Sequence, residues 1–284
     1  MKHIFVYAIL LVSVFSSCEK RVNFKLPYEG DKIVINSLIQ PDSVIYVRVT
    51  RSVPSIVYDE NGFTEIKDAA VTLEQDGVVM APVQQQQIGG RRYFVSAEKA
   101  VLGKQYTIRA AVAGMPAVMG GDTLPSAPEV GEATAQRGSN RVRFTLKDRP
   151  GAADYYRVRI FAYGPDQQPD TLRFFRLDPS FNNNLVDVIT SFDKTSLIMH
   201  DERFNGKQVN FVLQTQDPII NTSYLMVEVS TLTKSACNYL ETVAAQQDNG
   251  AGIAAEPVTV FTNVVNGYGI VAGIHTKRMV IKVE

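Results

Sequence analysis

The sequence predicts a mainly β protein: an N-terminal immunoglobulin-like β-sandwich domain, followed by a larger antiparallel β domain with one short helix. Two observations predict this class. Apolar and polar residues alternate with a period of two along most of the chain after residue 30, and one segment alone, residues 235–247, has helical spacing. The composition fits a folded chain, because 45% of the 284 residues are apolar, a share that disordered chains lack.

The alternation predicts half-buried strands with one apolar and one polar face. It is clearest at residues 44–50, 71–75, 78–83, 106–112, 141–146, 208–216 and 279–284. Asp76 and Gly77 tolerate the positive φ of a tight turn, so we expect a hairpin there. By the same reasoning Asn266 and Gly267 predict a hairpin turn, and Gly269 a bend or bulge just after it.

The helical segment places Cys237, Leu240 and Ala244 on one face, and residues 248–250, Asp-Asn-Gly, end it. We expect Cys237 to be a small buried apolar residue. A reactive thiol would need an electropositive and accessible setting.

Two prolines within residues 122–129 favour an extended connector, because proline fixes φ and donates no ladder hydrogen bond. This divides the chain into a β-sandwich domain at residues 31–124 and the antiparallel β domain at residues 125–284.

The first residues have the pattern of an export signal. Lys2 precedes an apolar run over residues 4–15, which is shorter than the ~20 residues that span a bilayer. Small residues then lead to Cys18. We expect residues 1–17 to be a lipoprotein signal peptide, Cys18 to carry palmitate-type acyl chains, and residues 18–30 to be the lipidated tether. The alternative is a plain secretory signal with an incidental cysteine.

The sequence offers little chemistry. The 29 basic and 29 acidic residues cancel, which argues against nucleic acid binding. His200 stands beside Asp201 and Glu202, but no second histidine follows at the spacing of a zinc helix. We therefore expect a polar loop there, with no metal, no cofactor and no catalytic residues. A secreted hydrolase with dispersed catalytic residues, His200 or His275 among them, remains an alternative.

One strand suggests a partner. Alternate residues on one face combine aromatic and arginine side chains, which are typical anchors of protein interfaces. These candidate partner-binding residues are Tyr155, Arg157, Arg159, Phe161 and Tyr163. The alternative is that both faces of this strand are covered by the protein itself.

An Asp, then Ser or Thr, then an aliphatic residue occurs at three places. This pattern is similar to the periplasmic O-glycosylation acceptor of Bacteroidota, so Ser43, Thr123 and Thr171 are candidate glycosylation sites. The alternative is that these residues cap turns next to strands.

Three segments together resemble a known family. They are Cys18 with the charged residues, Leu26-Pro27 and the strand at 32–40 that follow it; the polar turn at 201–207; and residues 257–269. They resemble Bacteroidota outer-membrane lipoproteins with a domain of unknown function, often encoded beside TonB-dependent receptors. The resemblance implies a lipid-anchored protein of the cell outer membrane, either an accessory or a ligand-binding partner of such a receptor. The family it resembles has no assigned catalytic residues, so the resemblance transfers none to this sequence.

Two further questions stay open. Glu19, followed by Lys20 and Arg21, does not decide between the periplasmic and the surface-exposed face of the membrane. A structural adhesin or pilus-like surface subunit, assembled by strand exchange, is a further alternative.

Overall fold

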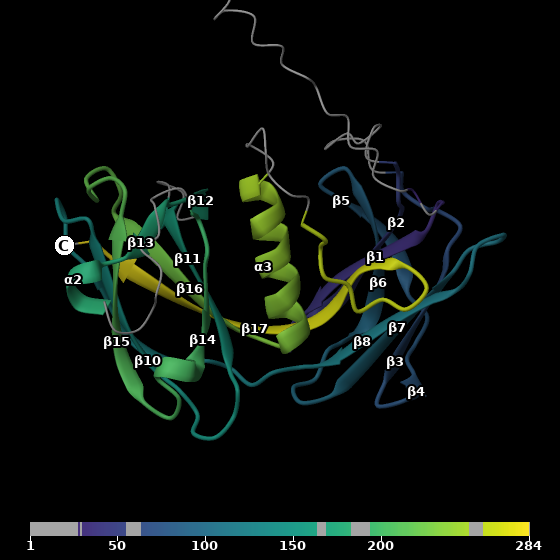
Figure 1. The fold of residues 1–284 in the computed structure, drawn as a ribbon, viewed down its shortest axis with the longest axis horizontal. Helices are drawn as coiled ribbons and strands as arrows, with labels where there is room; N and C mark the ends of the chain where they lie inside the picture. Colours follow the sequence, from purple (N-terminus) through teal and green to yellow (C-terminus); the bar gives the residue numbers. More distant parts are fainter. Residues whose placement is uncertain are drawn as a thin grey trace, which may run out of the picture. The chain divides into compact units, whose positions relative to one another are not determined.

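The structure is a computed structural model that describes residues 28, 30–54, 64–163, 169–182, 194–249 and 258–283. In these residues the protein is mainly β, with strands in three sheets and one helix longer than a single turn (Figure 1). The expected class is thus confirmed. The leader, Cys18 and the remainder of the tether up to residue 27 lie outside the described residues.

The largest sheet has nine strands, in the order β12 (Pro169–Leu172), β11 (Tyr155–Tyr163), β16 (Tyr224–Leu232), β17 (Tyr268–Lys282), β1 (Ile33–Ile39), β2 (Val44–Arg51), β6 (Arg91–Lys99) and β5 (Gln84–Ile88), with β14 (Leu197–His200) also paired to β11. A second sheet has the order β13 (Phe175–Leu177), β15 (Gln208–Thr215), β10 (Arg141–Lys147) and β9 (Glu129–Ala135). The third has the order β4 (Val78–Val79), β3 (Ala70–Gln75), β7 (Gln105–Ala111) and β8 (Val118–Thr123). The helices are α2 (Pro179–Asn182), the 3-10 turn η2 (Asp201–Arg203) and α3 (Lys234–Asn249).

Two hydrophobic cores fill the spaces between sheets. In the first core, Ile35 and Val47 of the large sheet pack with side chains of β3, β7 and β8, including the fully buried Ile108. In the second core, strands β11 and β16 pack against β10 and β15, where the rings of Phe144 and Phe211 stack 5.3 Å apart. Each core is therefore that of a β-sandwich.

Strand β17 joins these two cores. Its residues from Tyr268 to Gly273 pair in parallel with β1, and those from Ile274 to Lys282 pair antiparallel to β16. Val271 is buried in the first core and Ile281 in the second. The sheet is therefore continuous because one long strand changes partner along its length.

Helix α3 covers the opposite face of the same strand. Ala236 and Cys237 are buried in a third cluster with Ile270, Ala272 and Ile274 of β17. Figure 1 shows α3 alongside the yellow strand. The burial expected for Cys237 is confirmed, since the residue is 0% exposed.

Most expected strands are confirmed, and so is the helix. Asp76 and Gly77 have φ values of 50° and 80°, which confirms the tight turn between β3 and β4. The prediction of a strand over residues 78–83 is wrong beyond Val79, where β4 ends, and β5 begins only at Gln84. Pro82 lies between them and has no backbone N–H to donate to a neighbouring strand.

The end of the chain also differs from expectation. Asn266 lies in a turn with a φ of 62°, but this turn does not connect a hairpin. It leads from a single bridge between Met119 and Val265 into β17, whose first partner is the distant β1. The strand expected at 279–284 is the last part of β17. Strand β8 ends at Thr123 and β9 begins at Glu129, so residues 124–128 belong to no strand.

Gly269 permits the parallel pairing, and its replacement should break it. It lies opposite Ile35 with a φ of +105°, and a Cβ there would lie 1.9 Å from the Ile35 carbonyl oxygen. We expect Gly269→Ala to reduce the free energy of unfolding by about 2–5 kcal/mol, combining positive-φ strain and overpacking. Urea denaturation measures this.

Gly114→Ala is the matched control. Gly114 has a φ of +78°, but a Cβ added there would meet nothing within 4 Å, so only the cost of positive φ applies, about 1–2 kcal/mol. Equal losses in the two variants would contradict the close approach of β17 to β1.

Candidate functional site

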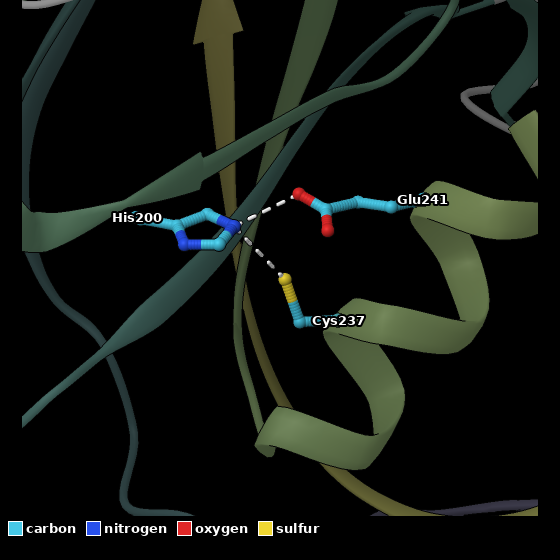
Figure 2. A group of neighbouring side chains, drawn as sticks. All are labelled: His200, Cys237 and Glu241. Atoms are coloured by element: carbon cyan, nitrogen blue, oxygen red, sulfur yellow. Dashed lines mark hydrogen bonds and ion pairs between the residues drawn. The ribbon is translucent and has the colours of Figure 1, made fainter. Parts of the chain in front are cut away.

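Three side chains with metal-ligating or acid–base chemistry meet between strand β14 and helix α3. His200 Nε2 lies 2.9 Å from Glu241 Oε1 and 3.6 Å from Cys237 Sγ. Figure 2 shows the imidazole of His200 pointing toward both helical side chains. One nitrogen, one oxygen and one sulfur atom thus face a common point, and all lie within 4.8 Å of one another.

Local structure explains this convergence. The Thr233 hydroxyl accepts a hydrogen bond from the Ala236 N–H at 3.2 Å, which caps the first turn of α3. Cys237 and Glu241 are four residues apart and so project from one face of the helix. His200 is the last residue of β14, directly opposite Tyr155 in β11.

Tyr155 also fixes the imidazole. Its ring meets that of His200 edge-on, with centroids 5.1 Å apart. Burial, followed by the negative groups around it, including Glu202 and Glu241, raises the pKa of the Tyr155 hydroxyl. The acidic side chains Asp201, Glu202 and Glu241 therefore give the surroundings of the cluster a negative charge.

The cluster does not have the arrangement of a cysteine nucleophile. Burial, and then the charge of Glu241, raise the pKa of the Cys237 thiol to about 12. The reactive form of cysteine is the thiolate, which this setting disfavours. In addition, the same nitrogen of His200 faces both partners, whereas a relay needs one ring nitrogen for the thiol and the other for the carboxylate.

A second group, the aspartate cluster, consists of Asp148, Asp154 and Asp201, which are 2–4% exposed. Protein groups satisfy each carboxylate: the Tyr156 hydroxyl and Gly206 N–H on Asp148, Arg149 on Asp154, and the Asn205 amide on Asp201. These bonds hold the turn after β10 against the loop after β14. The prediction of a solvated loop around His200 is wrong for Asp201, which is buried and belongs to this network.

The candidate partner-binding face of β11 makes contacts inside the protein. Arg159 and Arg278 donate to the two carboxylate oxygens of Glu228, which is 2% exposed. Arg157 is 9% exposed and lies 3.9 Å from the same carboxylate. The other members of the face are half-buried: Tyr155 against His200, Phe161 under Arg159, and Tyr163 with its hydroxyl on Met226.

Sheet register explains the Glu228 cluster. Glu228 in β16 lies directly opposite Arg159 in β11 and Arg278 in β17. Burial would raise the pKa of the Glu228 carboxyl, but the hydrogen bonds and charges of the arginines outweigh it, so the pKa is lowered. Burial also lowers the pKa of the Arg157 guanidinium, to about 10.

The candidate glycosylation residues have different settings. Ser43 is half-buried in the turn before β2, and Thr123 is exposed at the end of β8. Thr171 belongs to β12, but its side chain lies outside the described part of the structure. Of the described helices, none is long and apolar enough to cross a membrane.

No pattern in the sequence by itself places His200 beside Cys237 and Glu241. The spacing of Cys237 and Glu241, four residues apart in an expected helix, was a usable signal. The sequence gives no sign that His200 joins them, because its position depends on the pairing of β14 with β11 and on the packing of α3 against β17.

These features define a β-rich protein of two sandwich cores joined by a shared strand, with a polar cluster under its single long helix among the described elements. Residues 19–279 match the family described as Domain of unknown function (DUF4249). The chain belongs to this family.

Other comparisons add little. No curated protein matches the chain. Among solved structures, the collagen adhesin (CNA) from S. aureus is similar at 7% identity, over 89% of this chain and 96% of that chain, with a TM-score of 0.22. A likeness at this TM-score supports no conclusion about function.

Removing the buried carboxylate should leave its arginines without a counter-charge. We expect Glu228→Gln to lower the free energy of unfolding at pH 7 by about 3 kcal/mol. Folding lowers the pKa of Glu228, so its contribution is present above the unfolded pKa of about 4.3 and is lost as the pH falls toward the folded pKa. The two proteins should therefore converge in stability in acid. Urea denaturation between pH 7 and pH 3 measures both effects.

Glu129→Gln is the control for that substitution, because its pair with Lys147 is exposed at 57% and 62%. It should leave the stability nearly unchanged. A Glu228→Gln protein that keeps the wild-type stability at pH 7 would show that the buried carboxylate is not a stabilising centre.

The Cys237 thiol should resist alkylation while the protein is folded. It is 0% exposed and its pKa is raised to about 12, so iodoacetamide at pH 8 meets neither an accessible nor an ionised sulfur. Mass spectrometry of the peptide that contains Cys237 measures the rate, with urea-unfolded protein as the control. Equally fast labelling of the folded protein would refute this description of the thiol.

Proposed function

We propose that this protein is a bacterial outer-membrane lipoprotein of the Bacteroidota type, anchored through Cys18, that serves as a non-enzymatic accessory of a TonB-dependent receptor. The observation that carries the anchoring is the apolar leader, which ends in small residues at Cys18. The family match begins at residue 19, directly after this cysteine. This position supports cleavage before Cys18, because the matched residues then exclude the leader and begin one residue after the start of the mature tether.

The chemistry of the cluster supports an accessory role over the hydrolase alternative. The two histidines outside the leader have assigned contacts: His200 with Glu241 and Cys237, and His275 through Nδ1 with the Pro125 carbonyl at 3.2 Å. The neutral thiol beside His200 is a poor nucleophile. The partnership with a receptor rests on the three sequence segments that resemble receptor-associated lipoproteins.

Replacement of the lipidation residue tests the anchor. We expect Cys18→Ala to abolish incorporation of a labelled palmitate analogue and to move the mature protein out of the membrane fraction, since the acyl chains supply the membrane affinity. Fractionation of cells, followed by immunoblotting, measures this. The Cys237→Ala variant is the matched control and should stay lipidated. Unchanged labelling of Cys18→Ala would rule out the proposed anchor.

Affinity capture tests the partnership separately. The lipidated protein, solubilised from native membranes in mild detergent after crosslinking, should bring down a TonB-dependent receptor. Recovery of the anchored lipoprotein always alone would overturn the accessory role and leave the anchor intact. Protease treatment of whole cells then distinguishes the periplasmic from the surface-exposed face.

A further inference from the structure

We propose that His200, Cys237 and Glu241 form a binding site for a Zn²⁺-class divalent cation. This goes beyond the proposed function, and its test does not depend on a membrane or a receptor. The three residues supply one imidazole nitrogen, one sulfur and one carboxylate oxygen, which are the ligand types that zinc takes in proteins.

The two distances from His200 Nε2 fit the cation with little movement. Metal–ligand bonds of about 2.0–2.3 Å in a tetrahedral arrangement place neighbouring ligand atoms about 3.3–3.6 Å apart. His200 Nε2 lies 3.6 Å from Cys237 Sγ and 2.9 Å from Glu241 Oε1. The carboxylate needs to withdraw by only a few tenths of an ångström, and Glu241, at 42% exposure, has the freedom to do so.

The setting selects the kind of cation. A sulfur ligand favours borderline and soft metals over Ca²⁺ and Mg²⁺, which take oxygen ligands. Asp201 and Glu202 follow His200 directly and add negative charge near the site. His200 and Glu241 are about two-fifths exposed, so a fourth position on the cation faces solvent and takes a water molecule.

Binding is a proton exchange. The Cys237 S–H bond breaks, the sulfur keeps the electron pair and forms the bond to the cation, and its proton leaves to solvent. The proton that His200 Nε2 donates to Glu241 also leaves that nitrogen. In a neutral imidazole it moves to Nδ1 through solvent, which frees the Nε2 electron pair for the cation. No oxidant or further reactant is required. The bound cation replaces the His200–Glu241 hydrogen bond and links helix α3 to strand β14.

Cobalt titration of the full chain, purified in detergent, tests the site, because Co²⁺ bound to thiolate gives a sulfur-to-metal charge-transfer band that oxygen and nitrogen ligands do not. We expect one Co²⁺ per chain, displaced by Zn²⁺. Cys237→Ser should lose the band, and His200→Gln and Glu241→Gln should each weaken binding by more than ~10-fold, the loss that even outer ligand partners cause.

His275→Gln is the matched control, because it removes a histidine outside the cluster, and it should bind Co²⁺ as the wild type does. Zn²⁺ should also raise the melting temperature of the wild type but not that of Cys237→Ser. If Cys237→Ser fails to fold, His200→Gln still tests the site. The His200 side chain is 41% exposed, so its replacement should leave the fold intact. Absence of the band in the wild type, or equal affinity in His200→Gln, would show that the cluster is only a hydrogen bond between helix and strand.

Discussion

The fold depends on strand β17 being shared. Its first residues complete the parallel pair with β1, and its last residues complete the antiparallel pair with β16. One side of the strand contributes Val271 and Ile281 to the two sandwich cores, and the other supports α3. Backbone hydrogen bonds and three hydrophobic clusters therefore meet on fifteen consecutive residues. A defect here weakens the whole assembly, whereas a defect in the β3–β4 hairpin affects one edge.

The sequence predicts local structure well and distant pairing poorly, for a physical reason. Period-two alternation and the Asp76–Gly77 turn depend on neighbouring residues, and they identified β2, β10, β15 and the first hairpin. Pairing of β1 with β17 joins residues more than two hundred positions apart, and no local pattern encodes it. The face of β11 shows the same limit. In the sequence its arginines resemble interface anchors, and only the structure shows that Arg157 and Arg159 lie beside the buried carboxylate of Glu228.

The candidate site follows the same division. The helical positions of Cys237 and Glu241 follow from the sequence, as does the burial of the sulfur. His200 joins them only through the tertiary fold, and its Tyr155 contact needs the β11–β14 register. The aspartate cluster also depends on the tertiary fold. In the sequence its members resemble ordinary loop carboxylates, and only the structure shows that they are buried and accept hydrogen bonds from backbone and side-chain donors.

The shared strand also has a consequence for biogenesis. A polypeptide is synthesised from its amino end, and the first sandwich lacks Val271 and the parallel neighbour of β1 until residues 268–273 have followed. Strand β1 can pair early with β2. Its other edge stays open, and its apolar side chains stay incompletely covered, until β17 has been made. Slow closure is expected of such long-range topology, so the open edge of β1 is a place where a chaperone can protect the incomplete fold.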